Sequence, residues 1–152
     1  MRTTYGHFRR GKSFFAYYRT VRDSVQISEL RTSCTALVAR CGGLIVADAT
    51  DLGTGSIVDL PGYARLYDAL DNARVDAFVT DMARADFGPT LILGLYAVCV
   101  VSGVEMWDVN VGRITDAQVK ATVDVFNDRF EKSAEDSRLS IHRMLSRPTW
   151  LS

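Results

Sequence analysis

The sequence predicts an α/β fold in which a mainly parallel sheet of four to five strands carries helices on both faces. Short segments of apolar and β-branched residues alternate along the chain with longer segments of helical periodicity. This alternation is typical of parallel strands that are joined by right-handed crossovers. The chain has 152 residues, of which 47% are hydrophobic and 24% are charged, and these values suit one globular domain with a sizeable core.

The amino-terminal part of the chain supplies two of the expected strands and the first helix. Residues 1–12 are polar and basic, and we expect them to form a flexible arm. The aromatic and β-branched segment from Phe14 to Val21 predicts the first strand. Apolar residues then recur at helical spacing from Val25 to Cys41, and Gly42-Gly43 ends that helix. The segment from Leu44 to Asp48 predicts a short buried strand.

A loop and a second helix follow. Residues 49–60 are rich in Gly, Thr and Asp, which predicts a loop. The run "GTGS" within it lacks the Lys-Ser/Thr pair of a phosphate-binding P-loop, so we interpret it as an ordinary connection. Pro61 favours the first turn of a helix. The inner face of this helix is expected to carry Tyr63, Leu66, Tyr67 and Leu70.

The next segments predict two more strands with a third helix between them. Val75 to Thr80 predicts the third strand, and Val104 to Val111 predicts the fourth. The helix between them is expected to begin at Pro89 and to end by Gly103. Its inner face is expected to carry Leu91, Ile92, Leu95 and Val98.

A long amphipathic segment runs from Thr115 to about Ser146. Thr115 and Gln118 have the spacing of a helix capping box. A helix of this length would extend roughly 45 Å, so its far end either lies along the domain or, as we expect, contacts a partner. The expected interface residues are Val123, Phe126, Phe130, Ile141 and Met144. The chain then divides into an arm (1–12), an α/β domain (13–113) and an oligomerisation helix (114–147).

The bulk composition argues against several classes of protein. The 18 basic residues equal the 18 acidic ones, which gives no support for tight non-specific DNA binding, although a local basic face stays open. The longest apolar run, from Leu91 to Val101, is about half the length of a membrane span. Because no apolar run of signal-peptide length opens the sequence, we expect a cytoplasmic protein with reduced cysteines. Two histidines and no Cys-x-x-Cys motif lead us to expect neither a metal site nor a cofactor.

Four segments carry a resemblance that extends over about residues 14 to 146. They are "AYYR" on the first strand, "LVARCGGLIVAD", "DLPGYARLYDAL" and "RVDAFVTDMARADF". In this order and spacing they resemble the catalytic domain of the serine recombinases, the resolvase and invertase group. The first is similar to the family pattern Y-x-R-V-S, and the last to D-x-V-V-x-x-L-D-R-L-G-R.

The resemblance implies a chemistry that this sequence only partly retains. In the family, a serine attacks a DNA phosphodiester, and several arginines stabilise the charge on the five-coordinate phosphorus. The first-strand arginine is present as Arg19. The serine position holds Val21, which has no hydroxyl and cannot act as a nucleophile. The arginine expected just before Pro61 is Leu60.

The segment "DMARADF" departs further from the family pattern. The family's aspartate falls on Ala83, its first arginine on Arg84 and its last arginine on Phe87. We therefore expect a pseudoenzyme with no catalytic residues. The two arginines that remain, Arg19 and Arg84, either hold an anion such as phosphate or form ion pairs with nearby aspartates.

A second hypothesis keeps the activity and moves the nucleophile to Ser24. Arg22 precedes Ser24 by two residues, which echoes R-V-S. The neighbouring Thr20 is a poorer candidate, because successive strand side chains point to opposite faces and Thr20 should point away from Arg19. This alternative is an active site-specific DNA recombinase in which Arg19, Arg22 and Arg84 assist Ser24.

Acidic residues also lie near the predicted strand ends. They are Asp48, Asp51, Asp81, Asp86 and Asp108. Their oxygens could gather a divalent cation, but acidic residues are common in such loops, and we expect no metal.

Basic residues gather near the end of the long segment. They are Arg138, His142, Arg143 and Arg147. The resemblance implies that this end runs over the DNA minor groove, where Arg138 and Arg143 would contact the backbone. Alternatively, with the acidic residues before them, they form a solvated face of mixed charge. Family members carry a further DNA-binding region, whereas only "PTWLS" follows Arg147, so we expect either a fragment or a protein without a separate reader of base sequence.

Together these observations predict a non-catalytic relative of the recombinases in which the fold is kept for assembly. We expect a homo-oligomer, in the form of a dimer, or a module that caps an active recombinase or another DNA-bound protein. The resemblance implies a regulatory role in a mobile element, phage or plasmid.

Overall fold

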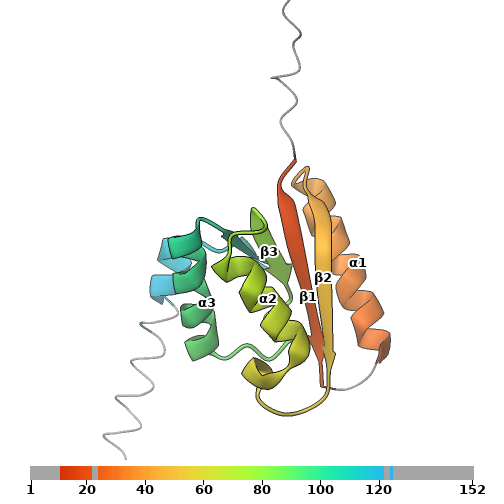
Figure 1. The fold of residues 1–152 in the computed structure, drawn as a ribbon. Helices are drawn as coiled ribbons and strands as arrows, with labels where there is room; N and C mark the ends of the chain where they lie inside the picture. Colours follow the sequence, from red (N-terminus) through yellow and green to blue (C-terminus); the bar gives the residue numbers. More distant parts are fainter. Residues whose placement is uncertain (1–10, 22–23, 122–123, 125–152) are drawn as a thin grey trace, which may run out of the picture. The chain divides into compact units, whose positions relative to one another are not determined.

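The structure, a computed structural model, describes residues 11–21, 24–121 and 124. It contains two compact units, Met1–Ile114 and Thr115–Ser152, which are described separately. In the first unit, strands alternate with helices (Figure 1). In chain order the elements are β1 (Ser13–Thr20), α1 (Ser24–Arg40), β2 (Leu44–Leu52), the 3-10 helix η2 (Ile57–Asp59), α2 (Pro61–Asp71), β3 (Ala77–Thr80), α3 (Pro89–Ser102), β4 (Glu105–Asp108) and β5 (Gly112–Arg113).

The five strands form one sheet in the order β2-β1-β3-β4-β5. β1 pairs in parallel with β2 and β3, and β3 pairs in parallel with β4. Only β5 runs antiparallel to its neighbour, β4. The predicted α/β class with a mainly parallel sheet is therefore confirmed.

The side chains of β1 alternate between two cores, one on each face of the sheet. Phe14, Ala16 and Tyr18 pack with the apolar residues of α1. Phe15 and Tyr17 pack with those of α2 and α3, and Figure 1 shows α1 and α2 on opposite sides of β1 and β2. A strand that is buried on both faces has a near-continuous apolar sequence, which explains why "FFAYY" lacks the usual alternation with polar residues.

All four predicted strands have different bounds in the structure, and the second and fourth differ most. β2 continues to Leu52, because its residues pair with β1 as far as Thr20 opposite Leu52. The predicted fourth strand is shorter and is followed by a turn and β5. The carboxylate of Asp108 accepts the N–H groups of Asn110 at 3.0 Å and Val111 at 3.2 Å, and Gly112, at a φ of 89°, adopts a conformation that favours glycine.

Helices α2 and α3 begin at the predicted prolines, with partly different inner faces. In α2, Tyr67 was expected on the inner face and is exposed. Helix α3 carries no charged residue, yet only Leu95 and Cys99 are fully buried. It ends as predicted at Gly103, which has a φ of 72°. Within the described residues, no helix combines the length and apolar character that a bilayer crossing requires.

The capping box at the start of the second unit is confirmed. The N–H of Thr115 donates to Gln118 Oε1 at 2.9 Å, and the N–H of Gln118 donates to Thr115 Oγ1 at 3.3 Å. Residues 116–121 are helical. The remainder of the expected long helix lies outside the described residues, except Asp124. So do the arm residues 1–10, the expected interface residues Val123, Phe126, Phe130, Ile141 and Met144, and the basic residues Arg138, His142, Arg143 and Arg147.

Candidate functional site

The carboxyl ends of the four parallel strands meet at one edge of the sheet. This is the edge at which open α/β sheets build their ligand sites. The positions that the resemblance marks for phosphate chemistry follow these strands. They are Arg19 and Val21 at the end of β1, Leu60 before α2, and Ala83, Arg84 and Phe87 after β3. This edge is therefore the candidate site.

Arg19 is buried beneath two loops of this edge, with 3% of its surface exposed. Its Nη1 donates to the carbonyl oxygen of Ala85 at 2.9 Å, and its Nη2 donates to that of Gly55 at 3.0 Å. The buried Nε has no hydrogen-bond partner in the described part of the chain. The guanidinium thus fastens β1 to the loop after β2 and to the turn after β3.

The two apolar replacements nearest to β1 and α2 have different surroundings. Val21 is 41% exposed, so a bare hydrocarbon faces solvent where the resemblance expects the nucleophile. Leu60 is partly buried and packs against the core between the sheet, α2 and α3. Its backbone also forms the N-cap of α2.

The turn after β3 directs Phe87 into the same core. Asp86 has a φ of 60°, a left-handed conformation that aspartate tolerates better than most residues. The N–H of Phe87 then donates to the carbonyl oxygen of Met82 at 3.0 Å. The Phe87 side chain is 8% exposed, and its ring centroid lies 6.0 Å from that of Tyr17. Where the resemblance expects an arginine, the chain therefore buries an aromatic ring.

Arg84 and Ala83 remain on the surface of this turn. Arg84 Nη1 lies 3.0 Å from Glu29 Oε2, and its Nε lies 3.7 Å from Asp81 Oδ2. Of the two alternatives expected for these arginines, anion binding and ion pairing, Arg84 forms ion pairs. Arg19 instead contacts backbone carbonyl oxygens. Ala83 is exposed and replaces the family's aspartate with a methyl group.

Asp81 and Asp108, two of the aspartates near the strand ends, accept hydrogen bonds from the protein. The carboxylate of Asp81 accepts the N–H of Arg84 at 3.1 Å and the side-chain amide of Asn110 at 3.2 Å. Asp108 accepts the N–H of Met82 at 2.9 Å in addition to its turn contacts. Among the residues that the structure describes, no group of three or more His, Cys, Asp or Glu side chains could hold a metal ion.

Asp51, at the end of β2, is the centre of a buried network. Its carboxylate accepts the Tyr17 hydroxyl at 2.6 Å and the N–H groups of Gly62 and Tyr63 at 2.8 Å each. Negative charge at a helix N-terminus is stabilised by the helix dipole. Burial, together with the hydrogen bond to Asp51, raises the pKa of Tyr17 well above its usual value. The network orients α2 against the sheet.

Gly62 is required by this network. A Cβ atom at position 62 would lie 2.6 Å from Asp51 Oδ2, closer than real Cβ contacts. The sequence contained one signal for this contact. A glycine in the first turn of a helix has low helix propensity, so "PG" at the start of a predicted helix indicates a close approach of another group.

Comparison with solved structures identifies the architecture. The N-terminal catalytic domain of TP901-1 integrase matches with a TM-score of 0.64 and 19% identity, over 82% of this chain and 98% of that one. A resolvase family site-specific recombinase from Streptococcus pneumoniae matches with a TM-score of 0.71 and 11% identity, over 90% and 99%. The C-terminal catalytic domain of an IS607-like serine recombinase gives 0.55 and 18%, over 78% and 79%. No protein-family model and no curated protein sequence matches the chain.

The chain has the fold of a serine recombinase catalytic domain. On this recombinase fold, Thr20 lies on the α1 face of β1, and its hydroxyl contacts Gln26 Oε1 at 2.7 Å. It thus points away from the loops that Arg19 contacts, as the strand alternation predicts. The alternative nucleophile Ser24 is the first residue of α1, and Arg22 lies outside the described residues.

Proposed function

We propose that the chain is a non-catalytic, serine-recombinase-like protein that acts as an oligomerising or regulatory module in DNA transactions. One observation carries the proposal. Leu60 and Phe87 occupy positions where the recombinase pattern expects phosphate-stabilising arginines. Phe87 is buried in the core, and the partly buried Leu60 packs against it. Their replacement is therefore part of the packing of this domain.

The remaining groups give weak support for phosphoryl transfer. Each preorganised donor that stabilises developing charge contributes roughly 3–4 kcal/mol to lowering the barrier. Arg19 is engaged by two backbone carbonyls, and Arg84 by two carboxylates. Val21 offers no lone pair for attack on phosphorus. The domain keeps its sheet and helices, while its two arginines are engaged by other groups of the protein. Such a domain is suited to binding a partner protein.

The partner follows from the same resemblance. The matched structures are an integrase and site-specific recombinases, so a protein of this fold is suited to pairing with itself or with such an enzyme on DNA. We propose a homodimer formed through the segment that follows Thr115, or a complex with a recombinase or another DNA-bound protein. A regulatory role in a mobile element fits this partner class.

The absence of strand cleavage can be tested directly. We expect the full chain, incubated with supercoiled plasmid DNA and analysed on denaturing gels, to form no covalent protein–DNA adduct. The physical reason is that Val21, which stands at the serine position, has no hydroxyl. Ser24→Ala is the matched control, and it should behave like the parent. An adduct formed by the parent and lost in Ser24→Ala would instead establish the active recombinase with a relocated nucleophile.

Assembly is tested by light scattering on the full chain. At roughly 50 µM, where association of a micromolar dimer is favoured by mass action, we expect at least the dimer mass. Phe130→Asp should lower the mass toward the monomer while far-UV circular dichroism stays unchanged, because a charge would enter the apolar stripe. Val58→Asp, at an exposed apolar position of η2, is the control. A parent protein that is strictly monomeric would contradict the homodimer and leave only the complex with another protein.

A further inference from the structure

The strand β2 forms one end of the sheet, so one of its edges pairs with no other strand in the described residues. This edge is nine residues long and exposes large apolar side chains. Leu44 is 66% exposed and Val46 is 53% exposed. An open strand edge offers backbone N–H and C=O groups to an added strand. Proteins commonly protect such edges with charges or cover them, and β2 carries few charges in its first half.

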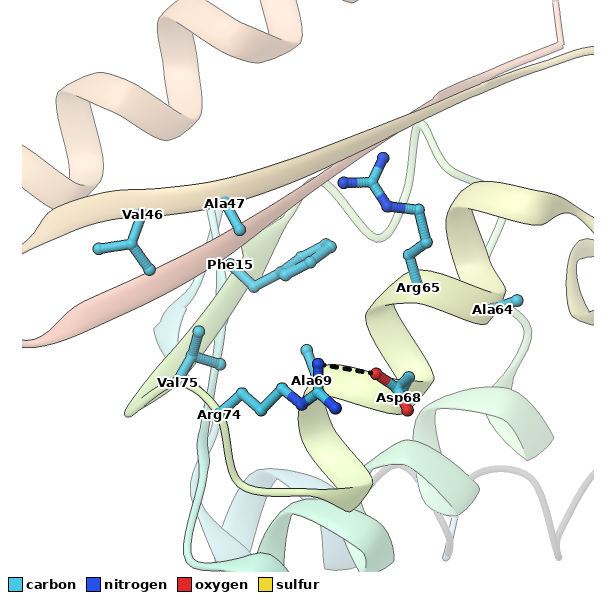
Figure 2. A pocket seen from close by; sticks show the side chains of 9 residues that line it. All are labelled: Phe15, Val46, Ala47, Ala64, Arg65, Asp68, Ala69, Arg74 and Val75. Atoms are coloured by element: carbon cyan, nitrogen blue, oxygen red, sulfur yellow. Dashed lines mark ion pairs between the residues drawn. The ribbon is translucent and has the colours of Figure 1, made fainter.

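A hollow of about 450 Å³ lies beside this edge, between β2 and α2 (Figure 2). The buried side chains of Phe15 and Val75 are called its floor here, and Figure 2 shows Val46 and Ala47 beside the strands. The lining contributed by α2 includes the small residues Ala64 and Ala69. The hollow is thus apolar inside and has room for an aliphatic side chain.

Two arginines border the same hollow. Arg65 extends from α2 toward the strands (Figure 2) and forms no ion pair with any described acidic residue. Arg74 Nη1 lies 3.5 Å from Asp68 Oδ2, and both side chains are mostly exposed, so this pair is weak. The border therefore has an excess of positive charge over an apolar floor.

A second hollow of about 360 Å³ lies on the opposite face of β2, against α1. It is lined by Tyr18, Ile45 and Arg31, among others, and the Arg31 guanidinium lies 5.4 Å from the centre of the Tyr18 ring. Successive side chains of an extended peptide point to opposite faces. A strand added beside β2 would therefore place alternate side chains over the two hollows.

We propose that β2 binds an extended peptide segment of a partner protein, with an apolar residue and an acidic residue two positions apart. Both of these side chains would then face the α2 hollow, the apolar one over Phe15 and the acidic one where the positive charges of Arg65 and Arg74 attract it. This assignment rests on the docking role proposed above and gives it a partner chemistry. The apolar floor favours a peptide over a nucleic acid, whose phosphates would use the arginines alone.

The charge pattern also favours a partner protein over a second copy of the chain. A two-fold pairing of β2 edges brings the same patch of each copy to face itself. Arg65 and Arg74 of one copy would then approach those of the other, and like charges in such positions are destabilising. An acidic side chain from a different protein removes this conflict.

The test uses the full chain labelled with ¹⁵N and an acetylated, amidated peptide, Thr-Thr-Val-Thr-Glu-Thr. We expect the peptide to shift the amide resonances of Val46, Ala47, Ala69 and Val75. The same peptide with Lys in place of Glu should shift them little. Arg65→Glu and Arg74→Glu should each weaken binding about tenfold, because they reverse a charge next to the acidic side chain. Ala64→Trp, at an exposed position of α2, should block the hollow.

Arg113→Glu, on β5 at the opposite edge of the sheet, makes the same charge change and should leave binding unaltered. The proposal is overturned if the peptide shifts none of these amides, or if the lysine peptide binds equally well. Shifts that depend on protein concentration without peptide would assign the edge to a second copy, and displacement of the peptide by duplex DNA would assign it to nucleic acid. These readouts are independent of the light-scattering measurement. A failure of the peptide to bind would therefore leave the result on self-assembly unchanged.

Discussion

Replacing Asp51 by alanine is expected to lower the free energy of unfolding by at least about 3 kcal/mol, because three buried donors lose their acceptor at a cost of about 1–3 kcal/mol each. These donors are the Tyr17 hydroxyl and the N–H groups of Gly62 and Tyr63. Two of them belong to the first turn of α2, which has no other carboxylate to satisfy it. The helix would also lose a negative charge at its N-terminus.

Urea denaturation followed by circular dichroism measures this effect. Asp48→Ala, on the same strand at an exposed position, is the control and should change stability by no more than about 0.5 kcal/mol. The free energy of unfolding of Tyr17→Phe should lie between those of Asp51→Ala and Asp48→Ala. This variant removes one donor and leaves the hydrogen bonds from Asp51 to α2 in place. If Asp51→Ala were as stable as Asp48→Ala, the buried network would not hold α2 to the sheet.

The fold class could be predicted from the sequence because the pattern of apolar and polar residues reflects which segments are buried. β1 reads as an apolar run since both of its faces are covered, and Pro61 and Pro89 mark the helix starts that the structure contains. The end of β2 was not accessible. Ala49 to Leu52 is polar in part, and its strand conformation depends on pairing with β1, which is a contact distant in sequence.

The sequence predicted which residues lie at the candidate site, but it predicted only some of the contacts that they make. The resemblance located Arg19 and Phe87, but it gave no sign that Arg19 would bind the carbonyl oxygens of Gly55 and Ala85. Every residue has a carbonyl group, so such partners leave no trace in the sequence. The inward direction of Phe87 depends in turn on the left-handed conformation of Asp86, which residue type alone does not determine.

The contrast between the two retained arginines bears on the proposed function. A site that stabilises a phosphate needs guanidinium groups whose donors point to a common space. Arg84 points to Glu29 and Asp81, while Arg19 is used to hold two loops. An arginine at a phosphate-binding position therefore need not bind phosphate. Arg19 and Arg84 instead stabilise the loops and turn at this edge of the sheet.

Replacing Phe87 by arginine, the residue that the recombinase pattern places there, is expected to lower the free energy of unfolding by at least about 3 kcal/mol. Removal of a buried phenylalanine ring costs about 3–5 kcal/mol, and an unpaired guanidinium in the same space adds a desolvation penalty. Phe87→Leu keeps an apolar side chain and should cost only about 1 kcal/mol. Chemical denaturation of both variants provides the measurement.

The pair of variants separates two views of this edge. If the space behind residue 87 belongs to the core, as its contact with Tyr17 indicates, the arginine variant is the less stable one by a wide margin. If Phe87→Arg proved as stable as Phe87→Leu, the side chain at position 87 would have a route to solvent beside Arg19. The edge of the sheet would then still have room for a phosphate-binding arginine, and the packing at position 87 would no longer favour a non-catalytic protein.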